Sequence, residues 1–118
     1  MSITQQPGRP IVAGYVWRID VRVTSGVTPV FPLGVVLVSQ LRRVVTDTAA
    51  IGTLRTADGT ITRLDNDTIE LKVPADMSAG WPTGSVTLDC VRTDGAEPQY
   101  LGFRLRVPVV QPVTRSLV

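Results

Sequence analysis

The stretch Gly84–Val107, which reads GSVTLDCVRTDGAEPQYLGFRLRV, predicts a long β-hairpin. Apolar and polar residues alternate along both arms, and this period of two is typical of a half-buried strand because successive side chains point to opposite faces. The turn signal between the arms is Thr93–Ala96, whose glycine adopts a positive φ at little cost. Arg104 and Arg106 are predicted to face outward. The residues predicted to face the core are Val86, Leu88, Cys90, Leu101, Phe103, Leu105 and Val107.

Short alternating segments of the same kind fill most of the remaining chain. Asp58-Gly59 lies between two β-branched runs, 53–56 and 60–64, and this dipeptide predicts a second hairpin. Counting all segments gives seven or eight strands with turn signals every 8–12 residues, which indicates an all-β sandwich. A jelly roll and a small barrel are the alternatives. Besides the two arms of the first hairpin, the expected strands are 15–23, 35–42, 53–56, 60–64 and 68–73.

Size and composition fit one domain with an aliphatic core. The chain has 118 residues, which is the usual length of a single domain, and few aromatic residues. The stretch 74–84 is the one place where we expect a helical turn, and Trp81 within it is expected to close the end of the core. The single cysteine, Cys90, excludes an internal disulfide and is expected to act as a small buried hydrophobic residue.

Both ends of the chain are predicted to be extended arms, over residues 1–14 and 108–118. Prolines recur in both segments, and each proline removes a backbone donor and biases the preceding residue away from the α conformation. Such arms gain order when they lie on a neighbouring protein. The candidate partner-contact residues in the arms are Ile11, Val12, Val110, Val113 and Arg115.

The residue types exclude most catalytic and metal-binding chemistry. The sequence contains no histidine, which removes the commonest general base and the commonest metal ligand. Asp65-Asn66-Asp67 resembles the start of a calcium loop, but the surrounding pattern favours a simple turn. We therefore expect no enzymatic activity, no cofactor and no bound metal. We also expect no membrane association, because no apolar stretch approaches the roughly 20 residues of a membrane span.

Arginine dominates the basic residues, with eleven arginines and one lysine spread along the chain. Nucleic-acid binders usually cluster their charge on one face, so we expect no nucleic-acid partner. Arg18 and Arg22 project from one predicted strand and Arg104 and Arg106 from another. If those strands are neighbours, the four arginines form a basic stripe that suits an acidic protein partner. The alternative is a solvated face balanced by nearby acids, which are Asp20, Glu70 and Asp89.

The order of several short motifs resembles that of a family of small tailed-phage domains, similar to the N-terminal domain of upper baseplate proteins. An aromatic strand is followed by a strand that ends in Gln40-Leu41-Arg42. The resemblance extends over nearly the whole chain. The matching segments are Tyr15–Val23, Gly34–Arg42, Ala57–Ile61, Trp81–Gly84, the strand with Asp89, and Val110–Arg115.

This resemblance implies an immunoglobulin-like sandwich that works as a non-catalytic structural component of a phage virion. It implies a tail or baseplate adaptor or a capsid-surface decoration protein, synthesised in the host cytoplasm and built into the virion. The implied partners are other phage structural proteins in a symmetric, multi-copy assembly. The alternative function is a carbohydrate- or receptor-binding module, for which the candidate contact residues are Trp81 and Tyr100, because exposed aromatic rings stack on sugars.

Overall fold

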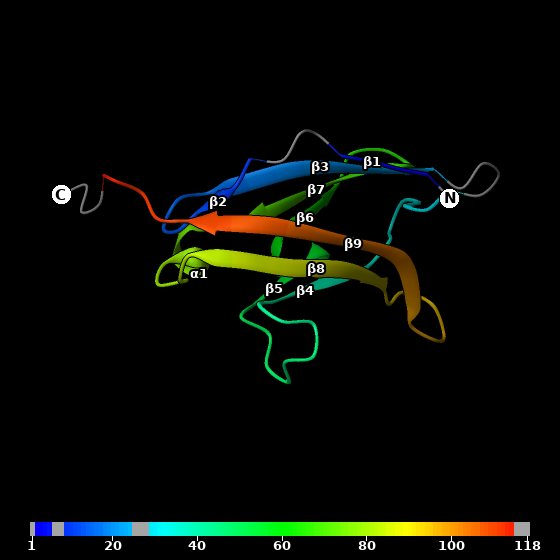
Figure 1. Ribbon diagram of the computed structural model, residues 1–118. Coiled ribbons are helices and arrows are strands. Elements are labelled where there is room, and N and C mark those ends of the chain that lie inside the picture. Colours follow the sequence, from blue (N-terminus) through cyan, green and yellow to red (C-terminus); the bar gives the residue numbers. More distant parts are fainter. Residues whose placement is uncertain (1, 6–8, 25–28, 115–118) are drawn as a thin grey trace.

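The computed structural model describes residues 2–5, 9–24 and 29–114 and shows two packed β-sheets (Figure 1). The four-stranded sheet has the order β1-β3-β7-β6, and the five-stranded sheet has the order β2-β9-β8-β4-β5. The first sheet comprises β1 (Ser2–Gln5), β3 (Trp17–Thr24), β7 (Thr68–Val73) and β6 (Ile61–Arg63). The second comprises β2 (Ile11–Val12), β9 (Gln99–Val110), β8 (Gly84–Arg92), β4 (Leu37–Arg42) and β5 (Gly52–Arg55).

This topology confirms the predicted sandwich. In an immunoglobulin-like domain, strands A, B, E and D form one sheet and strands G, F and C lie in the other. Here β1-β3-β7-β6 and β9-β8-β4 reproduce these two orders, and β5 extends the second sheet. The nine strands of the described residues exceed the predicted seven or eight, because the N-terminal segment supplies a strand to each sheet.

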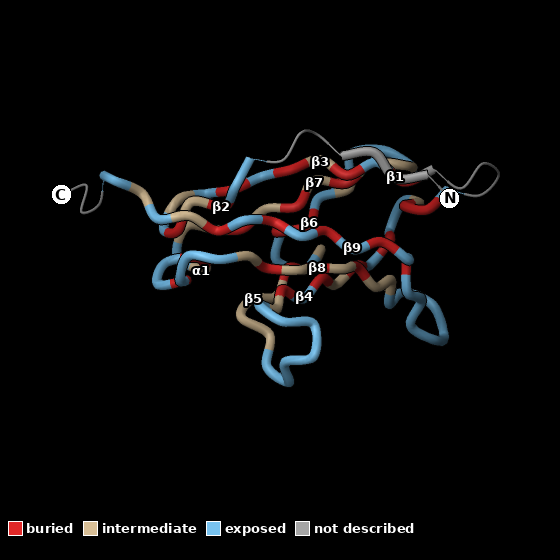
Figure 2. Tube along the Cα trace, in the orientation of Figure 1, coloured by how far each residue is buried: buried red, intermediate tan, exposed pale blue. Residues whose placement is uncertain are grey.

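The core lies between the two sheets and follows the alternation in the sequence. Figure 2 shows buried and exposed residues alternating along β9, where Leu101, Phe103, Leu105 and Val107 are buried. All seven predicted core residues of the hairpin are buried, including Cys90. The helical turn is also present, as α1 (Ala75–Ser78), and Trp81 after it is buried in the core as expected.

The β8–β9 hairpin is present with a longer loop than predicted. Residues 93–98 form the loop, whereas the sequence predicted a turn at Thr93–Ala96. The register shifts between Asp89 and Val91, and Gly102 on the facing strand has a φ of 78°, which is the left-handed conformation of a bulge residue. The bulge separates a long regular ladder toward Pro108 from a short one beside the loop.

The predicted hairpin around Asp58-Gly59 is wrong. β5 pairs with β4 in one sheet and β6 pairs with β7 in the other, so the intervening residues cross between the sheets. A 3₁₀ turn, η1 (Thr56–Asp58), is followed by Gly59 with a φ of 80°. The Thr60 hydroxyl accepts a hydrogen bond from the Arg55 amide at 2.7 Å, so this backbone donor has a partner within the turn. Leu54 on β5 and Ile61 on β6 are both buried, so the crossing brings one apolar side chain from each sheet into the same core.

The arms are shorter than predicted, because parts of both lie in the chain's own sheets. Ile11 and Val12 form β2, which pairs in parallel with Val109 and Val110 at the end of β9. The Ala13 amide donates to the Val110 carbonyl at 3.0 Å and extends this pairing. Beyond β9, the Gln111 side chain donates to the Trp81 carbonyl at 2.7 Å. The C-terminal segment is therefore tied to the sandwich at least as far as residue 111.

Candidate protein-contact face

The outer face of the five-stranded sheet carries an excess of arginine. Alternation along β4, β5, β8 and β9 directs these side chains away from the core, because their neighbours along each strand are buried. We call this surface the contact face. Its polar residues include four arginines and one aspartate, and they are Gln40, Arg42, Arg55, Thr87, Asp89, Arg104 and Arg106.

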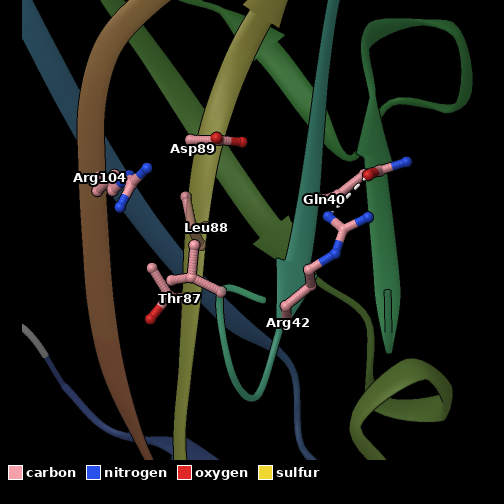
Figure 3. Close-up of a pocket in the computed structure, with 7 residues that line it drawn as sticks. Gln40, Arg42, Thr87, Leu88, Asp89 and Arg104 are labelled. Atoms are coloured by element: carbon pink, nitrogen blue, oxygen red, sulfur yellow. Dashed lines mark hydrogen bonds between the residues drawn. The ribbon is translucent and has the colours of Figure 1, made fainter. Parts of the chain in front are cut away.

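A small cup of about 60 Å³ lies at the centre of the contact face. Figure 3 shows Arg42 on β4 and Arg104 on β9, on either side of the β8 strand that carries Asp89. Asp89 is the register partner of Arg104 across the β8–β9 ladder. Arg42 donates to the Gln40 side-chain oxygen at 2.8 Å, which orients its guanidinium along the rim. The cup thus has two cationic walls and one carboxylate.

Three arginines of the contact face, Arg42, Arg104 and Arg106, donate hydrogen bonds to neutral acceptors. Arg104 donates to the Tyr100 hydroxyl at 3.4 Å, and Arg106 donates to the Ser85 hydroxyl at 3.1 Å. The bond to Tyr100 raises the pKa of Arg104. Guanidinium groups bind carboxylates in a bidentate way. These side chains are therefore chemically suited to carboxylates from another molecule.

The loop 43–50 projects beside the cup and holds two valines outward. Val44 and Val45 are 54% and 49% exposed, and Val45 lines the cup. The loop is braced from within: the Asp47 amide donates to the Val44 carbonyl at 2.9 Å, and the Arg42 Nε donates to the Asp47 carbonyl at 3.0 Å. Figures 1 and 2 show this loop standing away from the sandwich and exposed along its length. We call it the valine loop.

A second cavity, of about 590 Å³, lies where residues 9–18 meet residues 112–114. It brings together three predicted contact residues, Val12, Arg18 and Val113, which belong to separate segments of the sequence. The Trp17 indole donates to the Arg9 carbonyl at 2.9 Å, and the Tyr15 hydroxyl donates to the Thr114 carbonyl at 2.9 Å. Tyr15 was predicted to begin the strand 15–23, but β3 begins at Trp17 and Tyr15 is partly buried at this opening.

The other predicted arm residues have different placements. Ile11 is fully buried under the β2–β9 pairing, so it serves the core and is not available at the surface. Val110 is partly buried at the end of β9. Arg115 lies outside the described residues.

The predicted basic stripe does not form. Arg18 and Arg22 lie on β3 in the four-stranded sheet, whereas Arg104 and Arg106 lie on β9 in the five-stranded sheet. On β3, Arg18 faces Lys72, and the next outward pair along the ladder is Asp20 with Glu70. With Arg22, this face carries three basic and two acidic side chains on β3 and β7, which comes close to the predicted alternative of a solvated, balanced face. Asp89, the third acid of that alternative, lies on the other sheet.

The two aromatic residues considered for sugar binding are unequal. Trp81 is 8% exposed, because it packs into the core, and its ring is not available for stacking. Tyr100 is 50% exposed, and its hydroxyl is the acceptor for Arg104. The structure therefore removes one of the two candidate contacts from the surface.

The Asp65-Asn66-Asp67 segment forms the predicted turn between β6 and β7. The Asp67 amide donates to the Asp65 carboxylate at 2.8 Å, and this bond lowers the pKa of Asp65. Arg63 donates to the Asn66 side-chain oxygen at 2.6 Å. No group of three or more cysteine and acidic side chains that could hold a metal occurs within the described ranges. In the same part of the chain, no helix is long and apolar enough to cross a membrane.

Comparison with known proteins gives no match to a family model and no significant match to a curated protein. Sequence reasoning missed the valine loop because residues 43–52 are only weakly patterned. The one signal was the adjacent pair Val44-Val45, which follows Arg42-Arg43 outside any alternating strand.

Proposed function

We propose that this chain is a non-catalytic structural component of a tailed-phage virion that binds neighbouring proteins through the contact face. Within a particle it serves as a tail or baseplate adaptor or as a capsid-surface decoration protein. The single observation that carries the proposal is the valine loop beside the cup, because it places exposed apolar side chains next to arginines on one side of the molecule. The immunoglobulin-like strand order agrees with the fold that the family resemblance implies.

The chemistry of this face favours an acidic partner. Arg42 and Arg104 pair with carboxylates of the neighbouring protein, while Val44 and Val45 enter an apolar recess on it. Burying one half-exposed valine contributes on the order of 1 kcal/mol, so the two valines supply a modest apolar anchor. The arginines contribute mainly to specificity and to the rate of association. Many copies in a symmetric assembly then multiply a modest contact into a stable one.

Quantitative mass spectrometry of purified particles tests this function. Particles produced from the genome that encodes this chain are separated on a density gradient, and the copies of the chain per particle are counted. We expect the chain to travel with the particles in a fixed, multi-copy ratio. Its absence from intact particles, with the free protein left in the lysate, would contradict the proposal.

A further inference from the structure

Among the described residues, the outer edge of β9 is paired only at its C-terminal end. β9 spans Gln99–Val110, but β2 pairs only with Val109 and Val110. Figure 1 shows β9 crossing the front of the molecule, with β2 beside its C-terminal end. Within the described ranges, β9 has β8 along one side and no strand other than β2 along the other. Such an edge is a ready template for an added strand.

One hydrogen bond fixes which backbone groups point toward this edge. The Val110 carbonyl accepts the Ala13 amide at 3.0 Å, so the backbone of Val110 faces β2. Because alternate residues of a strand direct their amide and carbonyl to the same side, Arg104 and Arg106 direct theirs toward the open edge. Pro108 has no amide hydrogen, and the parallel pairing of Ile11 with Val109 directs its carbonyl to β2, so Arg104 and Arg106 supply the free backbone groups of the edge.

The free edge has a defined length. The bulge at Gly102 limits it at one end, and β2 limits it at the other. The regular segment between these limits is Phe103–Pro108, which spans about 20 Å at roughly 3.3 Å per residue. This length matches a common strand of five or six residues. A short extended segment therefore fits the space between the bulge and β2.

The side chains along this segment select the chemistry of an added strand. Arg104 and Arg106 are exposed on the outer face, while Phe103, Leu105 and Val107 are buried on the inner face. Antiparallel pairing with a second copy would bring arginine close to arginine, and like charges across a sheet are destabilising. An added strand suits this edge if its acidic residues lie beside Arg104 and Arg106 on the outer face. Its apolar residues would then lie beside the buried side chains on the inner face.

We propose that the open edge of β9 between Phe103 and Pro108 binds an extended acidic segment of a partner protein as an added β-strand. The backbone of Arg104 and Arg106 pairs with the segment, and their guanidinium groups contact its acidic side chains. Apolar side chains of the segment cover the rim of the core beside Leu105. The inference rests on the proposed function only in taking the partner to be another particle protein.

A synthetic nine-residue peptide in which glutamate alternates with valine tests the edge directly. Binding to the full chain is followed by amide hydrogen exchange, read by NMR. We expect the peptide to slow exchange at the amides of Arg104 and Arg106. The amides of Leu105 and Val107 face β8 and stay protected with and without peptide. Binding without new protection at Arg104 and Arg106 would overturn strand addition.

Two peptide controls separate backbone pairing from charge attraction. A lysine–valine peptide of the same length keeps the strand pattern with the wrong charge. An N-methylated glutamate–valine peptide keeps the charge but lacks donors on its pairing edge. We expect each to bind at least about tenfold more weakly than the parent peptide. Equal binding of the N-methylated peptide would show a purely electrostatic contact and overturn the inference.

Matched charge reversals on the protein complete the test. Arg104→Glu with Arg106→Glu is expected to weaken binding of the glutamate–valine peptide by at least about tenfold and to strengthen binding of the lysine–valine peptide. Arg22→Glu with Lys72→Glu makes the same charge change on the four-stranded sheet and is expected to leave the preference for the acidic peptide intact. Thermal melting of both variants establishes that they are folded. An equal loss in both variants would overturn the assignment to β9.

The two proposals fail separately. If the chain is present in particles but no peptide protects the β9 edge, only the strand-addition inference is overturned. If the peptide binds but particles lack the chain, only the virion function is overturned. A free chain that sediments as a dimer and has the amides of Arg104 and Arg106 already protected would identify a second copy as the occupant and overturn the acidic partner.

Discussion

The two sheets have similar inner faces and different outer faces. On β3 and β7 of the four-stranded sheet, three basic side chains (Arg18, Arg22 and Lys72) lie beside two acidic ones (Asp20 and Glu70), so the charges nearly cancel. The contact face on the five-stranded sheet has four arginines and one aspartate, with the valine loop projecting beside them. The fold requires a buried inner face from both sheets, so the difference outside is free to serve binding. The unbalanced face is therefore the better candidate for protein contacts.

The inner faces differ in a smaller way. The strands of the four-stranded sheet that have described side chains bury only apolar residues between the sheets, among them Ile19, Val21 and Leu71. The five-stranded sheet also buries Ser39 and Cys90. Ser39 Oγ has no hydrogen-bond partner among the residues that the structure describes. The five-stranded sheet, which has the arginine-rich outer face, therefore also has the inner face that is not purely hydrocarbon.

The largest expected effect comes from removing the apolar contact of the valine loop. Val44→Asp with Val45→Asp should lower the copies per particle at least about thirtyfold, because two apolar anchors are lost and two unpaired carboxylates enter the interface. Copies are counted by mass spectrometry after supplying the variant in trans to a genome that lacks the gene. Leu33→Asp is the control, since Leu33 is 84% exposed in a different loop. Normal incorporation of the double variant would remove the valine loop from the contact face.

A matched pair of single charge reversals compares the two outer faces directly. Arg104→Glu should lower the copies per particle about tenfold, because a cationic wall of the cup becomes repulsive to an acidic partner. Lys72→Glu makes the same charge change on the four-stranded sheet and should leave incorporation within about twofold of the wild type. If both substitutions act equally, the contrast between the two faces has no functional meaning.

Cys90 tests the inner face of the five-stranded sheet. Cys90→Ser should destabilise the fold by about 2 kcal/mol in urea unfolding, because a hydroxyl costs more free energy to desolvate than the thiol it replaces in the core. Cys90→Ala, which introduces no polar group, should cost less. Outer-face variants such as Thr87→Ala should change stability by under about 0.5 kcal/mol.

The same thiol predicts a pH dependence. Burial, with a smaller effect of Asp89, raises the pKa of Cys90 from 9.0 to about 12. Above pH 9 the unfolded chain loses this proton while the folded chain keeps it, so stability falls as pH rises from about 9 toward about 12. Cys90→Ala should fall less steeply over that range. A thiol that reacts with a disulfide reagent in the folded protein at pH 8 would contradict its burial.

Ser39 gives an effect of opposite sign. Its hydroxyl is fully buried on β4 and, within the described part of the chain, has no hydrogen-bond partner. Ser39→Ala should therefore stabilise the fold by about 1 kcal/mol, because it removes a polar group that was desolvated without compensation. Urea unfolding measures the change. A loss of stability would indicate that the hydroxyl has a partner in solution, such as a buried water.

The smallest expected effect lies in the β8–β9 loop. Arg92 and Asp94 form an ion pair at 2.7 Å, and the hydrogen bond from Arg92 lowers the pKa of Asp94 from 3.8 to about 2. The pair therefore supports folding above about pH 4, and its contribution is lost as pH falls toward about 2. Asp94→Asn should show a slightly shallower loss of stability across this window in acid titrations. An unchanged slope would mean that the pair contributes nothing measurable.

Much of the fold was predictable because alternation is a local property. The period of two along 84–107 identified the buried face of both arms, and the same pattern identified the strands at β3, β4 and β7. The helical turn near Trp81 and the turn at Asp65–Asp67 were also predictable, because proline, glycine and aspartate restrict the backbone locally. These inferences needed no knowledge of which strands meet.

The sequence by itself determined which side of each strand is buried, because a side chain's direction depends only on its neighbours along the chain. Only the tertiary structure decided which strands pair. It placed Arg18 and Arg104 on different sheets, turned Asp58-Gly59 into a crossing between sheets, and paired β2 with β9 in parallel. Pairing depends on how all strands together bury one core, so residues close in sequence can separate and distant ones can meet. The arginine cup and the open edge of β9 are products of that collective choice.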